Sequence, residues 1–157
     1  MPGVAVRRYQ RQDLPALMEV RASSIRDVVA RDYTQAQIDA WVETAKDMDE
    51  LARRFGEKMI TWVACDGAEI VGFTNLGADG YLDCMYVHGA HQGRGVASAL
   101  LNALEQEART QQQPRLHSEV SLTARPFFEN RGYHVVTPQR VTVNGQTYDN
   151  FRMEKRL

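Results

Sequence analysis

The stretch HQGRGVASALLNAL, which runs from His91 to Leu104, places two glycines around Arg94 directly before a helix-like apolar pattern. A glycine costs about 1 kcal/mol relative to alanine inside a helix, so two of them at a helix start need a physical reason. One reason is a tight turn from a strand into a helix. The other is a loop whose backbone N–H groups approach an anion closely, because a helix N-terminus favours negative charge.

The residues around this loop predict a strand before it and an amphipathic helix after it. GYLDCMYV, residues 80–87, has the composition of a β-strand. After the loop, apolar side chains recur on one helical face, at Val96, Leu100, Leu101, Leu104 and Ala108. The loop lacks the lysine of a P-loop, and it lacks the third glycine of a dinucleotide fingerprint because only Ala97 and Ser98 follow Gly95.

The rest of the chain alternates strand-like and helix-like segments, without an internal repeat, a low-complexity tract or a flexible linker. Strands are expected at residues 4–9, 59–65, 69–76, 115–122, 133–143 and 146–157. Helices are expected after Asp13 and Thr34 as N-caps, and over residues 47–55 and 123–132. Asp66-Gly67 and Asn144-Gly145 predict hairpin turns. We therefore expect a single α+β domain over residues 1–157.

The composition describes an ordinary globular protein, with 43% hydrophobic and 25% charged residues among 157. The net charge of −1 gives no electrostatic case for binding nucleic acid or an anionic membrane. No apolar run has the length of a membrane span, and the start, MPGVAVRRYQ, lacks the apolar stretch of a signal peptide. The two cysteines, Cys65 and Cys84, fall in separate strand-like runs, which argues against a disulfide framework. We expect a cytoplasmic monomer or homodimer with reduced thiols.

Two segments, QGRGVA from Gln92 to Ala97 and ARPFFENRGY over residues 124–133, carry a resemblance to a known family. The first resembles the motif Q/R-x-x-G-x-G/A with which GCN5-related N-acetyltransferases bind the pyrophosphate of acetyl-coenzyme A (acetyl-CoA). The second is similar to the family's A-x-x-[LF]-Y-E-x-x-G-F, and SEVSLTARPFFENRGYHVV is closest in pattern to a YafP-like bacterial branch. The resemblance covers the whole chain. It implies a mixed, mostly antiparallel sheet of about seven strands with helices on both faces.

The resemblance assigns cofactor-binding roles to the loop and to the strand before it. The main-chain N–H groups that would meet the pyrophosphate belong to Gly93, Arg94, Gly95, Val96 and Ala97, with the side chains of Gln92 and Arg94 nearest to it. Tyr86 and Val87 would pair with the pantetheine amides in the manner of an added strand. Ser121 stands where many members carry an asparagine that contacts the pantetheine arm. Phe127 and Phe128 would flank the thioester end of the arm.

The reaction that the resemblance implies needs particular groups in the protein. The acceptor, a primary amine of a small molecule or peptide, attacks the thioester directly, and its ammonium form, with a pKa near 10, must first lose a proton. The N–H donor for the tetrahedral intermediate is expected at the strand end, near Tyr86 and Val87. Phe128 replaces the family tyrosine that protonates the leaving thiolate, and this is the largest departure from the pattern.

Three other side chains are candidate acid–base groups. Tyr81 and Asp83 lie two residues apart, so they share one face of their strand. Asp83 is either a hydrogen-bonded structural carboxylate or the general base, acting directly or through water. Glu119 is a second carboxylate with the same two alternatives, and Tyr81 either packs in the strand or serves as the acid or as a substrate contact. Tyr133 is expected to pack in the core.

The remaining candidates concern the acceptor and the overall class of protein. Tyr33 and Trp41 would roof an acceptor pocket, although Trp41 also fits a simple core position. His88 and His91 border the loop and are expected to be solvated, and no spacing of His or Cys suggests a metal site. Two other classes stay open: a non-catalytic acyl-CoA sensor, suggested by Phe128, and an unrelated α+β scaffold in which QGRGVA is only a turn.

Overall fold

The structure, a computed structural model, describes residues 3–157 of the chain. The strands are β1 Ala5–Arg8, β2 Ile60–Asp66, β3 Glu69–Leu76, β4 Tyr81–Val87, β5 Arg115–Ser121, β6 His134–Val143 and β7 Gln146–Arg156. The helices are α1 Leu14–Asp27, α2 Gln35–Val42, α3 Met48–Arg53, α4 Val96–Thr110 and α5 Arg125–Glu129, and a π-helical turn, Arg54–Lys58, continues α3. None of the helices in this described range is long and apolar enough to cross a membrane.

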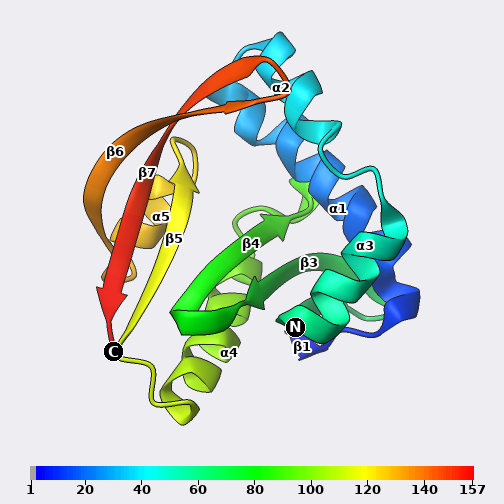
Figure 1. Cartoon of the computed structure of the whole chain (residues 1–157). Helices are drawn as coiled ribbons and strands as arrows, with labels where there is room; N and C mark the ends of the chain where they lie inside the picture. The colour runs from blue at the N-terminus through cyan, green and yellow to red at the C-terminus, as the bar shows by residue number, and fades with distance from the viewer. Residues whose placement is uncertain (1–2) are drawn as a thin grey trace.

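Within residues 3–157, seven strands form one sheet in the order β1-β2-β3-β4-β5-β7-β6. Neighbouring strands run antiparallel except β4 and β5, which pair in parallel. Figure 1 shows helices on both faces of this sheet. The mixed, mostly antiparallel α+β fold expected from the sequence is therefore confirmed.

The strands separate the two larger of three apolar cores within residues 3–157, because successive side chains of a strand point to opposite faces. In β2, Trp62 packs in the core under α4, whereas the next residue, Val63, packs in the core under α1 and α3. The apolar stripe predicted for α4 is buried at Val96, Leu100, Leu101, Leu104 and Ala108. Both faces of the β1–β4 half are thus covered by helices.

The sheet opens between β4 and β5. Their parallel pairing consists of two registered pairs, Tyr81 with His117 and Leu82 with Ser118. Beyond Leu82 the green and yellow strands diverge, as Figure 1 shows. Among the described strands, none pairs with the later part of β4 on its β5 side.

An extra residue on β4 marks the place where the strands part. Leu82 pairs with Leu76, and Met85 pairs with Thr74. Between these two pairs β4 has two residues, whereas β3 has only one. The side chain of Asn75 occupies the break and accepts the main-chain N–H of Cys84 at 2.8 Å. A bulge of this kind re-aims side chains, and here it lies at Asp83 and Cys84.

The hairpin of β6 and β7 arches over the opening and is fastened to α2 (Figure 1). The Tyr148 hydroxyl donates to the Gln37 carbonyl at 2.7 Å, and the Gln37 side-chain amide donates to the Thr147 carbonyl at 2.6 Å. At the hairpin turn, the Asn144 amide donates to the Ala40 carbonyl at 3.1 Å. The two halves of the opened sheet are therefore joined again above the opening.

The elements predicted from the sequence are present, with boundaries shifted by a few residues. Thr34 caps α2 as expected, since its side chain accepts the N–H of Gln37. The turns at Asp66-Gly67 and Asn144-Gly145 join β2 to β3 and β6 to β7. These predictions are correct because a helix cap or a tight turn depends on residues that are neighbours in the sequence.

Two details of the N-terminal half correct the prediction. Asp13 stands at the N-cap position of α1, but its carboxylate pairs with Arg7 at 2.8 Å and does not cap the helix. The hydrogen bond from Arg7 is the largest cause that lowers the pKa of Asp13. The helix predicted over residues 47–55 ends at Arg53, where α3 passes into a π-helical turn, a local form that often marks functional sites.

Candidate active site

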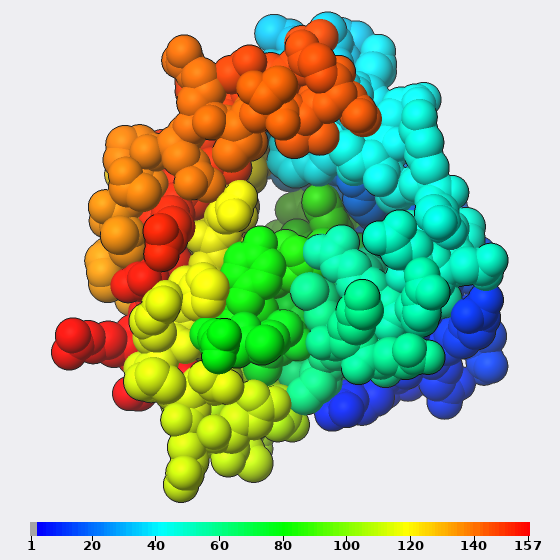
Figure 2. Space-filling model, in the orientation of Figure 1, coloured from blue at the N-terminus to red at the C-terminus, as the bar shows by residue number. Residues whose placement is uncertain are grey.

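A cavity of about 560 Å³ occupies the opening between β4 and β5. Figure 2 shows the hollow, framed by the green and yellow strands, the orange hairpin and the cyan helical segment. The lining side chains include Trp41, Tyr81, Asp83, Glu119, Phe127 and Tyr148. A concave, mostly apolar space of this size with a few polar groups is typical of small-molecule sites.

The glycine loop ends in an open helix N-terminus beside this cavity. Gly93 and Gly95 have φ angles of 74° and 79°, a left-handed conformation that favours glycine. Gly95 is the N-cap of α4 without a side chain to cap it, and Ala99 donates the first helical hydrogen bond, to the Gly95 carbonyl. The N–H groups of residues 95–98 therefore have no partner inside the helix. Such a terminus is suited to bind an anion.

Gln92 and Arg94 have different surroundings in the loop. The Gln92 side-chain amide donates to the Val87 carbonyl at 2.9 Å, so it fastens the loop to the end of β4. The Arg94 side chain is exposed. Arg94 is therefore available to a charged ligand, whereas Gln92 is already engaged.

The open edge of β4 presents main-chain groups of Met85 and Val87. The N–H and the carbonyl of Cys84 both bond to side chains of β3, at 2.8 and 2.7 Å. Because alternate residues of a strand direct their main-chain groups to opposite sides, those of Met85 and Val87 face β5. The family resemblance predicts this position for Tyr86 as well as for Val87. The main-chain groups of Tyr86 face β3 instead, since those of Cys84 and of His88, two residues to either side, bond to β3. The bulge, which shifts the alternation by one residue, is the cause.

Ser121, Phe127 and Phe128 form the opposite wall, where β5 leads into α5. The Ser121 hydroxyl accepts the Ala124 N–H at 3.1 Å, which orders the turn. Phe128 is 4% exposed, and its ring packs edge-on against Phe127 with centroids 5.3 Å apart. Both rings line the cavity, so this wall is apolar and position 128 offers no hydroxyl.

Tyr133, close in sequence to this wall, is a core residue, as predicted. Its hydroxyl donates to the Glu105 carboxylate at 2.8 Å, and burial raises its pKa far above the usual range. Lys155 binds the same carboxylate at 3.0 Å. The Tyr133 hydroxyl is therefore committed to a buried network and does not face the cavity.

Asp83 stands in the cavity wall as one half of an ion pair. Its side chain is 9% exposed, and the Arg54 guanidinium donates to its Oδ2 atom. The Cys84 thiol donates to the same oxygen at 3.3 Å. Arg54 belongs to the π-helical turn after α3, so a distant segment of the chain holds this carboxylate.

Tyr81 and Glu119 contribute to the cavity from adjacent strands. The Tyr81 ring packs on His117 with centroids 5.2 Å apart. Burial raises the pKa of Tyr81 to about 12, and the negative charges of Asp83 and Glu119 add to this shift. Glu119 is exposed, and it makes no ion pair in the described part of the chain. The site thus holds one paired carboxylate, one unpaired carboxylate and a tyrosine that keeps its proton at neutral pH.

Aromatic side chains from α2 and the hairpin form the roof of the cavity. Trp41 donates its indole N–H to the Tyr86 hydroxyl at 3.2 Å and meets the Tyr148 ring edge-on at 5.8 Å. Burial raises the pKa of Tyr86 to about 12. Tyr33 stands behind this roof and donates its hydroxyl to the Asp149 carbonyl at 2.6 Å. Trp41 lines the cavity, whereas Tyr33 fastens the hairpin.

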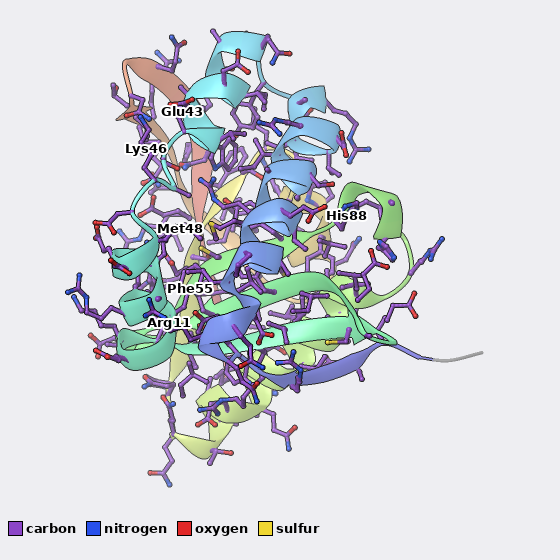
Figure 3. All side chains as sticks on the ribbon, turned by 90° about the vertical axis from the view of Figure 1, so that its right-hand side faces the viewer. Arg11, Glu43, Lys46, Met48, Phe55 and His88 are labelled. Carbon is purple, nitrogen blue, oxygen red and sulfur yellow. The ribbon has the colours of Figure 1, made fainter. Side chains whose placement is uncertain are left out.

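The histidines beside the glycine loop have local partners. His88 accepts the Ala90 N–H at 3.1 Å, and Figure 3 shows His88 on the side of α1 opposite to Met48. His91 lies 4.0 Å from Asp66. Across residues 3–157, no three His, Cys, Asp or Glu side chains come together in a group that could hold a metal ion.

Three residues of the site were missed by sequence reasoning. Arg54 meets a partner 29 residues away in the chain, which no local pattern announces. Met85 takes its place only because of the bulge. Tyr148 enters the cavity wall because the hairpin folds onto α2, a tertiary contact. The run of Thr, Tyr and Phe around it predicts a strand and nothing more.

Comparison with known proteins gives a direct match to one family. A model described as an acetyltransferase (GNAT) domain matches residues 29–157. The chain is 33% identical over 156 residues to a protein of Escherichia coli (strain K12) named "uncharacterized N-acetyltransferase YafP". That match covers 98% of this chain and 96% of the E. coli protein.

Solved structures share the fold. A protein of Rhodopseudomonas palustris, named "GCN5-Related N-acetyltransferase: Aminotransferase, Class-II", gives a TM-score of 0.95 at 32% identity, over 100% of this chain and 98% of that one. The PaiA N-acetyltransferase of Thermoplasma acidophilum, solved in complex with coenzyme A, gives 0.81 at 18% identity, over 99% of this chain and 100% of that one. The second likeness is one of fold alone.

Proposed function

The chain belongs to the GCN5-related N-acetyltransferase (GNAT) family, and from this premise we propose that it transfers the acetyl group of acetyl-CoA to a primary amine of a small molecule. Family membership excludes the unrelated scaffold left open by the sequence and favours an N-acetyltransferase over a non-catalytic sensor. The observation that carries the proposal is the cavity between β4 and β5. It joins an anion-binding helix N-terminus to an open strand edge and to an unpaired carboxylate.

The cofactor fits this site as an extended molecule with one phosphate-rich end. We place its pyrophosphate at the N–H groups of residues 93–97, where the dipole of α4 favours an anion. The pantetheine arm would follow the open edge of β4 and bond through its amides to the carbonyl of Met85 and the N–H of Val87, as an added strand does. The thioester end would then lie near the rings of Phe127 and Phe128. The T. acidophilum relative that was solved with coenzyme A supports this placement through its shared fold.

In the proposed reaction, the amine nitrogen attacks the thioester carbonyl carbon. The new C–N bond forms a tetrahedral intermediate, whose negative oxygen needs a donor already in place. We assign this role to the main-chain N–H of Met85, because it faces the cavity edge without a strand partner. Collapse of the intermediate breaks the C–S bond and releases coenzyme A as a thiolate.

Glu119 is a better candidate than Asp83 for accepting the proton of the amine. Asp83 already accepts bonds from Arg54 and Cys84 on one oxygen, whereas Glu119 makes no ion pair within residues 3–157. A positioned acid–base group typically contributes about 10² to 10⁴ in rate. We assign proton acceptance to Glu119, through a water molecule, and to Asp83 the neutralisation of Arg54, whose positive charge would otherwise repel the incoming ammonium group.

The thiolate leaves without a protein acid in this proposal. The pKa of Tyr81 is raised to about 12, whereas that of an ordinary thiol is about 8.5, so transfer of a proton from Tyr81 to the thiolate is unfavourable. Phe128 has no proton to give, and the Tyr133 hydroxyl is bound to Glu105. Tyr81 serves instead as a hydrogen-bond donor in the cavity.

The closed roof supports a small acceptor over a peptide that lies along the sheet. The hydrogen bonds of Tyr148 and Asn144 to α2 close the chain into a ring around the opening, which Figure 2 shows. An acceptor therefore enters this ring end-on. The cavity of about 560 Å³ must also hold the thioester end of the cofactor, which limits the size of the amine.

The test is a coenzyme A release assay over a panel of small primary amines and of peptides with a free amino group. Affinity for acetyl-CoA is measured in parallel by calorimetry. Turnover of small amines is the expected result. Tight binding of acetyl-CoA with turnover of peptides alone would overturn the small acceptor, and absence of binding would overturn the cofactor.

A further inference from the structure

Arg131 holds its guanidinium beside the N-terminus of α4. It donates to the hydroxyl of Ser98, in the first turn of α4. The carbon at the centre of its guanidinium lies 4.7 Å from the centre of the Phe127 ring. Phe127 lines the cavity, so Arg131 stands at the cavity edge, between the end of α5 and the start of α4.

A cation at this position is electrostatically unfavourable without an anion. The N-terminus of a helix carries about half a positive charge and repels other positive charges. Arg125, on the same segment, pairs with Glu129 at 3.1 Å. Arg131 has no such ion pair in the described range 3–157. The C-terminal end of α5 favours a basic residue at position 131, but it does not explain why the side chain turns toward α4.

We propose that Arg131 binds a phosphate group of coenzyme A. The inference rests on the proposed function, in which the N–H groups of residues 93–97 meet the pyrophosphate. Ser98 follows these residues directly, so an arginine bonded to its hydroxyl reaches the edge of the phosphate site. The planar fork of a guanidinium matches two oxygens of a phosphate, and the Phe127 ring keeps that plane in place.

Coenzyme A carries phosphate at two places, the pyrophosphate and the 3′-position of its ribose. Calorimetric titration of the whole chain with coenzyme A and with 3′-dephospho-coenzyme A separates them. Arg131→Met removes the charge and keeps an apolar stem over Phe127, and we expect it to weaken coenzyme A binding about tenfold or more, as for loss of a charge-assisted hydrogen bond. Arg131→Lys keeps the charge and is expected to lose less. Arg125→Met is the matched control and is expected to leave the affinity unchanged.

The two probes distinguish the two phosphates. Contact with the 3′-phosphate predicts that Arg131→Met weakens binding of coenzyme A but not of the 3′-dephospho form, and contact with the pyrophosphate predicts an equal loss for both. Unchanged binding of coenzyme A by Arg131→Met, or an equal loss in Arg125→Met, would overturn the proposal. If Arg131→Met does not fold, Arg131→Gln gives the same test with a side chain that still bonds to Ser98. Failure of the unmodified protein to bind acetyl-CoA would overturn the proposed function instead.

Discussion

The guanidinium of Arg54 and the carboxylate of Asp83 form an ion pair that ties the π-helical turn to the bulge of β4. The side chain of Arg54 is 40% exposed and that of Asp83 is 9% exposed, so the carboxylate is the desolvated partner. A desolvated charge that loses its partner costs more than the removal of both charges. Removal of the Arg54 charge is therefore expected to destabilise the fold more than removal of the Asp83 charge.

Arg54→Met is expected to destabilise the fold by about 1 kcal/mol, less than for a fully buried pair because solvent reaches Arg54. The double variant Arg54→Met/Asp83→Asn is expected to be more stable than Arg54→Met alone, since it no longer leaves a lone carboxylate. Urea unfolding of both variants measures the difference. Equal stability of the two would show that the carboxylate does not need Arg54.

Glu119→Gln is expected to lower kcat about 100-fold with little change in acetyl-CoA affinity, because the amide cannot accept the proton of the amine. Asp83→Asn is expected to act mainly on the KM of the amine. Steady-state kinetics with the best amine of the panel separates the two effects. Glu69→Gln, at an exposed position of β3, is the control. A Glu119→Gln enzyme with unaltered kcat would remove Glu119 as the proton acceptor.

Gly95→Asp is expected to weaken acetyl-CoA binding at least about tenfold, because it places a negative charge beside the proposed pyrophosphate site. Gly67→Asp is a matched control for backbone strain. Gly67 has a φ of +62° and Gly95 a φ of +79°, and an added Cβ meets nothing within 4 Å at either position. Gly67 lies in the turn between β2 and β3, far from the loop in sequence. Calorimetry that gives the same affinity for both variants would contradict the phosphate site.

Tyr81→Phe is expected to make the fold less sensitive to alkaline pH. Burial raises the pKa of Tyr81 from 10.0 to about 12, so the folded state keeps a proton that the unfolded state releases. The stability that this group contributes is complete below pH 10 and is lost as pH rises toward 12. One pKa unit corresponds to about 1.4 kcal/mol. Over this pH range we expect the free energy of unfolding to fall by about 1–2 kcal/mol less in the variant than in the original protein. Urea unfolding at three pH values measures the free energy of unfolding of the original protein and of the variant. An identical loss in the two proteins would contradict the burial of the hydroxyl.

The sequence predicts the elements of this fold because each one depends on neighbours in the chain. The glycines of QGRGVA and the apolar stripe after Val96 specify a loop and a helix whatever surrounds them. The site depends on contacts between residues that lie far apart in the chain. One extra residue in β4 exchanges Tyr86 for Met85 at the open edge, and the period-2 pattern carries no sign of it. The partner of Asp83 comes from another segment altogether, so the choice between a structural and a catalytic carboxylate required the fold.

The proposal that the roof selects small amines leads to a prediction about Tyr148. Its hydroxyl donates to the Gln37 carbonyl at 2.7 Å, and its ring meets Trp41 at 5.8 Å, so it both fastens the hairpin and closes the cavity. Tyr148→Phe removes the hydrogen bond alone. Tyr148→Ala removes the ring as well and enlarges the acceptor end of the cavity.

We expect Tyr148→Ala to raise kcat/KM for a bulky amine about tenfold relative to a small one, since apolar pockets discriminate by factors of this order. Tyr148→Phe is expected to keep the size preference of the original enzyme, because the ring that limits the space remains. Acetyl-CoA affinity should be the same in both variants, as the cofactor lies toward α4 and α5 in the proposed arrangement, and its measurement also shows that each variant is folded. If Tyr148→Ala binds acetyl-CoA normally and keeps the original size preference, the roof does not select the acceptor, and peptides become the better candidates.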